Sequence, residues 1–144
     1  MAPVWLGMRY ARCFLALAVW VLASCGDSSA PKALDGYWVH VLAPDEPPGF
    51  SLGIVFVTTN GTVTGTGGWQ GEAMPGGTVT ATGTIERGTV ALDLTFTQVL
   101  SGVPQPNSFV EHFVGTFTTR NDLEGSTTGD GLQGVLHLRR SPGP

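Results

Sequence analysis

The feature that most constrains this chain is the alternation of apolar residues with threonines in its second half. In the segment 78–86, Val79, Ala81 and Ile85 alternate with threonines, and the segment 89–99 repeats the pattern. A period of two residues places successive side chains on opposite faces of a β-strand. The pattern therefore predicts strands with one apolar face and one threonine-rich face.

Residues 36–140 divide into eight such segments, and no part of them has a convincing helical pattern. Asn60-Gly61 is the strongest of the turn signals that separate the segments, because both residue types tolerate positive φ in a two-residue hairpin. The predicted strands cover residues 37–42, 50–58, 62–70, 78–86, 89–99, 108–118, 123–128 and 132–139.

Sequential antiparallel strands with one apolar face favour closure, which removes the exposed edges of the sheet. We therefore predict an all-β, eight-stranded antiparallel up-and-down barrel. A two-sheet β-sandwich is the alternative, since a period of two does not separate the architectures. Eight strands leave an interior just wide enough for side chains or for one small ligand.

The first 24 residues have the composition of an export signal. Arg9 and Arg12 precede an unbroken apolar run over residues 13–23, and small residues end the run. These are the three parts of a secretory signal peptide, which we expect to be helical. A membrane-spanning helix needs about 20 apolar residues, so a permanent span is the weaker interpretation.

The run ends in Leu22-Ala23-Ser24-Cys25. This sequence resembles the lipobox of bacterial lipoproteins, and the resemblance implies that Cys25 is acylated and becomes the N-terminus. Two or three acyl chains would anchor the protein stably to a membrane of the bacterial cell envelope. Gly26, not an acid, follows the cysteine, which favours the outer membrane over the inner. The alternative is a chance cysteine in an ordinary signal peptide.

The expected domain organisation is a signal peptide (1–24), a flexible tether (25–35), the barrel (36–140) and a short tail (141–144). Removal of the signal would remove Cys13, and acylation would cap the thiol of Cys25. No disulfide is therefore expected. The part after residue 24 has five basic side chains against all 11 acids, a formal net charge of −6. With no basic stripe, we predict no nucleic-acid partner.

Gly36-Tyr37-Trp38 opens the first predicted strand, and Arg139 and Arg140 end the last. This order resembles lipocalins and their calycin relatives, in which an arginine from the end of the barrel packs across the tryptophan. The resemblance implies a calycin-like barrel closed at one end by Gly36, Trp38 and one of the two arginines. The other lipocalin motifs are not visible. Avidin-like barrels share the opening, but their biotin-contacting residues have no counterpart here.

Candidate ligand-binding residues are Trp38, Trp69, Glu111 and Phe113. Trp69 follows a glycine-rich run and is either a core plug or a platform on which a ligand stacks at the barrel mouth. Glu111 shares a strand face with several phenylalanines. Inside the barrel, this carboxyl group would have a raised pKa and could orient a ligand. We favour the alternative, that the phenylalanine face lies outside or that a bulge shifts the register, because register is read poorly from sequence.

The three histidines, His40, His112 and His137, fall on different predicted strands, and no His-x-His or Cys-x-x-Cys spacing exists. Zinc needs three or four converging ligands, so we predict neither a metal site nor a cofactor. No Gly-x-Ser-x-Gly elbow and no cysteine nucleophile remain after residue 25, so an enzyme is not expected.

The sequence thus predicts a lipid-anchored, non-enzymatic envelope lipoprotein that binds a small apolar or amphipathic ligand. The alternative is a structural or inhibitory protein that binds another envelope protein through its barrel surface or loops. An apolar interior cavity would favour the first function. A barrel plugged by Trp38, Trp69 and the phenylalanines would favour the second.

Overall fold

The computed structural model describes residues 31–42, 49–71, 75–98, 107–132 and 134–143, so the predicted signal peptide, its helix and Cys25 lie outside the described residues. Among the described residues, no helix is long and apolar enough to cross a membrane. The strands are β1 (Gly36–His40), β2 (Phe50–Thr59), β3 (Thr62–Gly71), β4 (Gly77–Glu86), β5 (Thr89–Gln98), β6 (Asn107–Thr119), β7 (Asp122–Gly129) and β8 (Gly134–Ser141).

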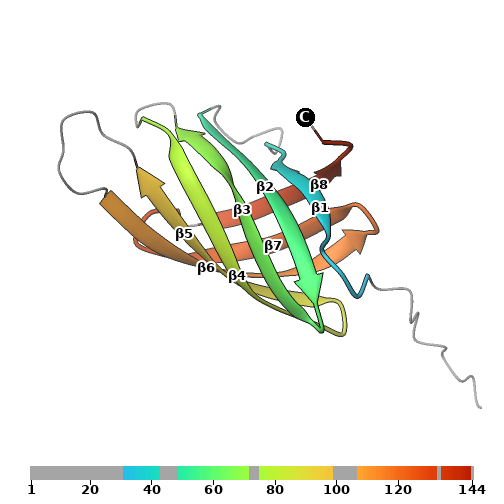
Figure 1. Cartoon of the computed structure of the whole chain (residues 1–144). Helices are drawn as coiled ribbons and strands as arrows, with labels where there is room; N and C mark the ends of the chain where they lie inside the picture. Colours follow the sequence, from blue (N-terminus) through green and yellow to red (C-terminus); the bar gives the residue numbers. More distant parts are fainter. Residues whose placement is uncertain (1–30, 43–48, 72–74, 99–106, 133, 144) are drawn as a thin grey trace, which may run out of the picture.

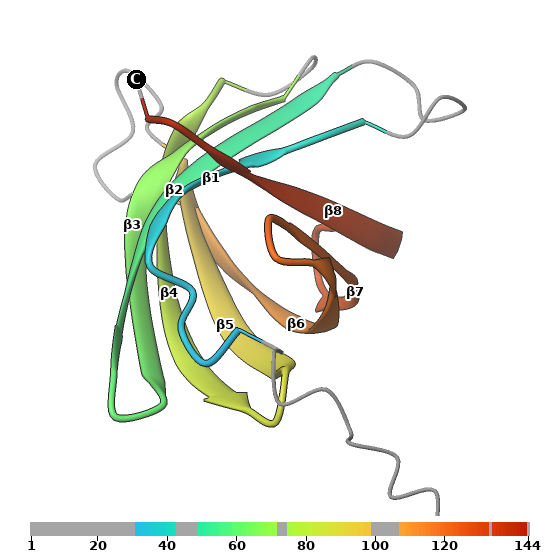
Figure 2. The same ribbon diagram turned by 90° about the vertical axis from the view of Figure 1, so that its right-hand side faces the viewer.

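These strands form one closed antiparallel barrel in which each strand pairs with its neighbours in the chain (Figure 1). Pairing of β1 with β8, where Trp38 lies opposite Arg140, closes the sheet. Figure 2 shows the strands curving around a common interior. The predicted barrel is therefore confirmed, and the sandwich alternative is wrong because all eight strands belong to one continuously paired sheet.

The predicted strands all overlap the observed ones, with differences at their ends. The largest difference is in β8, which begins at Gly134 and not at residue 132. The backbone N–H groups of Gly131 and Leu132 bond a buried carboxylate instead of a neighbouring strand. A side chain thus delays the start of β8, an effect that the alternation of residue types does not reveal.

Two hairpins are as tight as the sequence predicts. Asn60 and Gly61 have φ angles of 53° and 80°, and Arg87 and Gly88 have φ angles of 50° and 83°. Positive φ at both central residues is the geometry that matches the twist of the flanking strands. Both turns therefore connect their strands without loosening the barrel.

The alternating strand directions give the barrel two different ends. We call the end at which β1, β3, β5 and β7 finish the mouth, and the opposite end the closed end. Leu34 and Asp35, which the sequence places in the tether, fold against the closed end. Thr58 bonds both of them, through its hydroxyl to the Leu34 N–H at 2.8 Å and through its own N–H to the Asp35 carboxylate at 2.6 Å.

Apolar side chains from all eight strands fill the interior. A side chain with no accessible surface has no water-sized space beside it, and the exposed fraction is 0% for Trp38, Phe96 and Phe113. Other interior residues at 0% are Leu34, Ile54, Val63, Val90 and Leu94. The middle of the barrel is therefore packed with side chains, as protein cores generally are.

The expectation that the phenylalanine face of residues 108–118 lies outside is wrong. The register does shift in β6, but between Phe117 and Thr119, and the shift does not turn Glu111 outward. Glu111 is fully buried, and its backbone lies opposite Leu94 of β5. The next residue, His112, pairs with Asp93 on the outer surface, where both side chains are exposed. Because successive residues of a strand face opposite ways, this outer pair directs Glu111 inward.

Candidate functional site

Four aromatic side chains gather inside the mouth. Phe96 and Phe109 stack with their ring centroids 5.0 Å apart and their planes 11° from parallel. Trp69 meets both rings edge-on, at 5.7 Å from Phe96 and 6.0 Å from Phe109. Phe50 completes the group at 6.4 Å from Trp69. We call these four rings, together with Glu111, the mouth cluster.

Glu111 is the buried acid of the mouth cluster. Its Oε1 accepts hydrogen bonds from the backbone N–H groups of Gly131 at 2.6 Å and Leu132 at 2.8 Å. Its Oε2 is buried and has no hydrogen-bond partner among the described residues. Buried polar atoms are nearly always hydrogen-bonded, and leaving one unpaired costs about 1–3 kcal/mol. Oε2 is thus a buried acceptor that lacks a donor among the described residues.

Trp69 carries the second unpaired group of the mouth cluster. Its indole Nε1 is buried and has no hydrogen-bond partner among the described residues. The other described tryptophan differs, because the Nε1–H of Trp38 donates to the carbonyl oxygen of Leu34 at 2.9 Å. The mouth therefore holds an unpaired acceptor and an unpaired donor within an apolar, aromatic setting.

The connection between β7 and β8 shapes this end of the barrel. Its described residues are Asp130, Gly131 and Leu132, and its backbone contacts the mouth cluster. A β-carbon at Gly131 would meet the ring of Phe109 at 2.5 Å, and one at Gly129 would come equally close to Glu111 Oε2. Only glycine allows the two N–H donors to approach the carboxylate this closely.

Of the candidate ligand-binding residues, Trp69 and Glu111 lie together in the mouth, and Trp38 and Phe113 do not. Phe113 packs in the middle of the barrel, where its ring fills the space beside Gly115 and Gly125. Trp38 lies toward the closed end, edge-on to Phe117 at 6.1 Å. Both side chains belong to the packed core.

At the closed end, Arg140 and not Arg139 covers Trp38. The guanidinium carbon of Arg140 lies 5.0 Å from the centroid of the Trp38 ring. Arg139 faces outward, and its Nε donates to Asp122 at 2.6 Å. The sequence left both arginines open for this role. The inward positions of β8 are Leu136, Leu138 and Arg140, which excludes Arg139.

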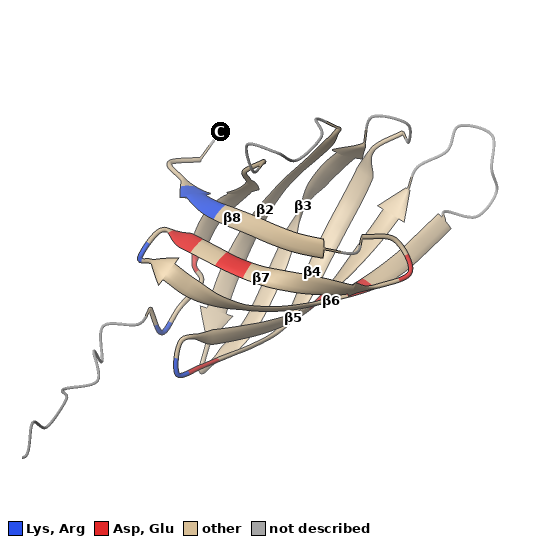
Figure 3. Ribbon diagram, turned by 180° about the vertical axis from the view of Figure 1, so that it is seen from behind, with Lys and Arg blue, Asp and Glu red and all other residues tan. Residues whose placement is uncertain are grey.

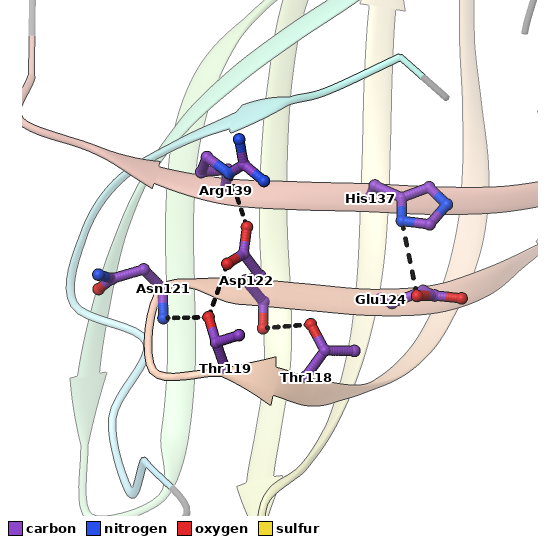
Figure 4. Close-up of polar contacts among 7 residues, drawn as sticks. All are labelled: Thr118, Thr119, Asn121, Asp122, Glu124, His137 and Arg139. Carbon is purple, nitrogen blue, oxygen red and sulfur yellow. Dashed lines mark hydrogen bonds and ion pairs between the residues drawn. The ribbon is translucent and has the colours of Figure 1, made fainter. Parts of the chain in front are cut away.

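A polar group surrounds Asp122 on the outer surface of β6, β7 and β8 (Figure 4). Thr119 donates its hydroxyl to this carboxylate at 2.6 Å, and Arg139 bonds its other oxygen. These hydrogen bonds, first from Thr119 and then from Arg139, hold the pKa of Asp122 below its ordinary value of 3.8. A groove of about 380 Å³ lies beside this group, lined also by Leu42 and His137.

The histidines lie apart from one another. His112 bonds Asp93 at 2.6 Å, and His137 lies 3.7 Å from Glu124, both on the outer surface. His40 lies at the mouth with its ring 5.5 Å from that of Phe50. In the described part of the chain, no three His, Cys, Asp or Glu side chains are grouped so that they could hold a metal ion.

The described basic side chains are confined to one end of the barrel. Every Lys and Arg of the described residues lies toward the closed end (Figure 3). These are Lys32, Arg87, Arg120, Arg139 and Arg140. Among the described residues, the mouth has the acids Glu111 and Asp130. In the described part of the mouth, no Lys or Arg therefore offsets these acids.

The fold and the site together define a class: a closed eight-stranded antiparallel barrel with a packed middle and an aromatic, acidic mouth. Comparisons of the chain with protein-family models, with curated proteins and with solved structures found no match in any of the three.

Sequence reasoning missed part of this site. It did not identify Phe50 and Phe96 as neighbours of Trp69, nor the two N–H donors of Gly131 and Leu132. From sequence alone, the pattern Gly129-Asp130-Gly131 predicts only a turn. Glycines flanking a turn beside an inward-facing acid are the signal that a close backbone approach was needed.

Proposed function

We propose that this protein is a lipid-anchored lipoprotein of the bacterial cell envelope whose barrel binds a small amphipathic molecule at its mouth. It acts as a binding module and not as an enzyme. Residues 1–24 direct export, Cys25 carries the acyl chains, and the outer membrane is the favoured location. The tether is short, since Leu34 and Asp35 already contact the barrel.

The observation that carries this proposal is the pair of unpaired buried atoms in the mouth cluster. Glu111 Oε2 accepts no hydrogen bond and the Trp69 Nε1–H donates none among the described residues. Ligand pockets combine apolar and aromatic walls with a few polar groups that fix orientation. A ligand with its apolar part against the four rings would satisfy groups that the folded chain leaves unsatisfied.

The packed middle of the barrel limits the size of this ligand. Phe96 and Phe113 are fully buried, whereas Phe50, Phe109 and Leu132 are only partly buried at the mouth. Because Glu111 is also fully buried, a ligand must displace the partly buried side chains of the outer layer to reach it. Such a ligand does not run down the barrel axis. We expect a molecule the size of one or two rings, not a long acyl chain.

A second candidate function is supported by the same packing. A filled barrel is the arrangement that favours binding of another envelope protein through the outer surface. The groove beside Asp122 and a second groove of about 450 Å³ along β1, β2 and β3 are outward-facing features of this kind. This function would leave the unpaired atoms of the mouth cluster without a role, so we place it second.

We further propose that the barrel is calycin-like. The support is the Gly36-Tyr37-Trp38 opening together with Arg140, whose guanidinium lies over the Trp38 ring. Such a contact contributes about 0.5–2 kcal/mol. A residue at position 36 also needs positive φ, which is 113° there, and this explains the glycine.

Native mass spectrometry of the protein purified from its own membranes tests the proposed function. The account predicts a population heavier than the acylated chain by the mass of one small molecule, which Glu111→Ala removes. A pull-down of a single envelope protein that survives Glu111→Ala, with no small molecule retained, would support the second function instead.

A further inference from the structure

The unpaired oxygen of Glu111 restricts what the ligand can be. Oε1 already accepts two backbone hydrogen bonds, so the carboxylate is held rigidly by Gly131 and Leu132. Oε2 is left as a fixed acceptor whose position the ligand must match. A carboxylate oxygen makes its strongest hydrogen bonds to charged donors such as ammonium groups.

The aromatic rings beside Glu111 favour the same ligand charge. The faces of Phe and Trp rings carry partial negative charge, and they attract organic cations within about 6 Å of the ring centroid. Phe96, Phe109 and Trp69 lie within 6.0 Å of one another. Phe109 lies beside Glu111, since a β-carbon on Gly131 would lie 2.5 Å from the Phe109 ring and 3.1 Å from Glu111 Oε1. A cation at Oε2 would therefore lie near this carboxylate and the aromatic group that includes Phe109.

The distribution of charged side chains over the barrel also favours a positively charged ligand. All five basic residues of the described chain lie toward the closed end, whereas the described charged residues at the mouth are the acids Glu111 and Asp130. An acidic cleft concentrates cations and repels anions. A ligand carboxylate would therefore find neither a positive partner nor a favourable potential at the mouth.

The alternative cation, a metal ion, does not fit the same residues. Within the described ranges no group of three or more His, Cys, Asp or Glu could hold one. Calcium and magnesium need six or more oxygen ligands. The Glu111 carboxylate instead lies beside the Phe109 ring and the backbone N–H groups of Gly131 and Leu132. The partner of Oε2 must therefore bring its own apolar surface.

We infer that the mouth cluster binds an organic ammonium ion with an aromatic or compact apolar body, with the ammonium N–H donating to Glu111 Oε2. This inference rests on the proposed function and specifies its ligand class. The apolar body lies against Phe50 and Phe109, which are the partly buried members of the cluster. The Trp69 N–H is free to donate to a hydroxyl or carbonyl oxygen of the ligand.

The test uses three probes of one shape: 2-phenylethylammonium, 2-phenylethanol and phenylacetate. The full acylated protein in phosphatidylcholine nanodiscs is titrated with each by calorimetry, with empty nanodiscs as the reference. A hydrogen bond to a charged group contributes about 1.5–3 kcal/mol, so the ammonium probe should bind at least about tenfold more tightly than the alcohol. Phenylacetate should bind most weakly.

Glu111→Gln should abolish this preference, because its amide keeps the acceptor for Gly131 and Leu132 but replaces Oε2 by a donor. Glu86→Gln is the matched control. It removes the same charge from an exposed position near the closed end, and it should keep the preference. If Glu111→Gln fails to fold, the relative affinities of the three probes for the unaltered protein still test the inference.

Two outcomes separate the inference from the function on which it rests. Binding of the alcohol or phenylacetate as tightly as the ammonium probe would overturn the inference and leave mouth binding intact. Absence of measurable binding for all three probes would overturn the ammonium inference. If native mass spectrometry also found no retained small molecule, the proposed function would fail with it.

Discussion

The guanidinium carbon of Arg140 lies 5.0 Å from the centroid of the Trp38 ring, while its neighbour Arg139 points outward to Asp122. The Trp38 indole is fully buried and donates to the carbonyl oxygen of Leu34. Arg140 therefore covers the core tryptophan at the closed end, whereas Arg139 bonds Asp122 on the outer surface, although the two arginines are adjacent in the chain.

This arrangement predicts unequal coupling of the two arginines to Trp38. Trp38→Ala should lower the free energy of unfolding by about 3–5 kcal/mol, and Arg140→Ala by about 0.5–2 kcal/mol. Urea melts of single and double variants should show non-additive losses for Trp38 with Arg140 and additive losses for Trp38 with Arg139. Coupling of Trp38 to Arg139 and not to Arg140 would contradict the structure.

A second prediction concerns the two N–H groups that Glu111 holds. Glu111→Ala removes their shared acceptor, so amide hydrogen exchange at Gly131 and Leu132 should accelerate by about tenfold or more. Glu111→Gln keeps an acceptor oxygen and should preserve most of the protection. Glu124→Ala, on the outer face of β7, serves as the control. Unchanged exchange at both amides in Glu111→Ala would disprove the role of this carboxylate.

The pKa of Asp122 predicts a loss of stability in acid. Hydrogen bonds from Thr119 and Arg139 hold this pKa below 3.8 in the folded state. The contribution is therefore complete above about pH 3.8, the unfolded value, and is lost as the pH falls through the lower folded pKa. The pair is exposed, so the contribution is about 1 kcal/mol or less.

Urea melts of the unaltered protein and Asp122→Asn at several pH values measure this effect. The difference in unfolding free energy should be constant between pH 5 and 7 and should shrink below about pH 3.8. Thr119→Val, which removes the hydrogen bond with the largest effect on this pKa, should narrow the pH range over which the loss occurs. A difference that is the same at pH 3 and pH 6 would contradict the assignment.

The lipobox interpretation predicts acylation at Cys25 alone. Cys25→Ala should abolish labelling by an alkyne-bearing fatty acid and leave a soluble or precursor form. Cys13→Ala, which alters the other cysteine, should label normally, because Cys13 lies within the apolar run of the signal. Labelling of the Cys25→Ala protein would rule out this anchor.

Much of the fold could be predicted because the strand pattern and the turn chemistry agree. Val90, Leu92, Leu94 and Phe96 alternate in the sequence and are all buried in β5. Asn60-Gly61 forms the tight turn that its residue types favour. Where local pattern and turn both point to one structure, the sequence is sufficient.

The orientation of β6 could not be predicted, because both of its faces are partly apolar. Val110 and Val114 are exposed on one face, and Phe113 is buried on the other. Only pairing with β5, whose Asp93 faces outward, settles which face is inside. The site could not be predicted for the same reason, since Glu111 becomes its central group only once β6 is oriented.

The two indole N–H groups give the most direct test of ligand binding at the mouth. Trp38 and Trp69 lie toward opposite ends of the barrel, and only the Trp38 N–H has a hydrogen-bond partner among the described residues. In a ¹H–¹⁵N spectrum of the protein, 2-phenylethylammonium should shift the Trp69 indole resonance and leave that of Trp38 unchanged. Equal shifts of both resonances, or a shift of Trp38 alone, would contradict a binding site at the mouth.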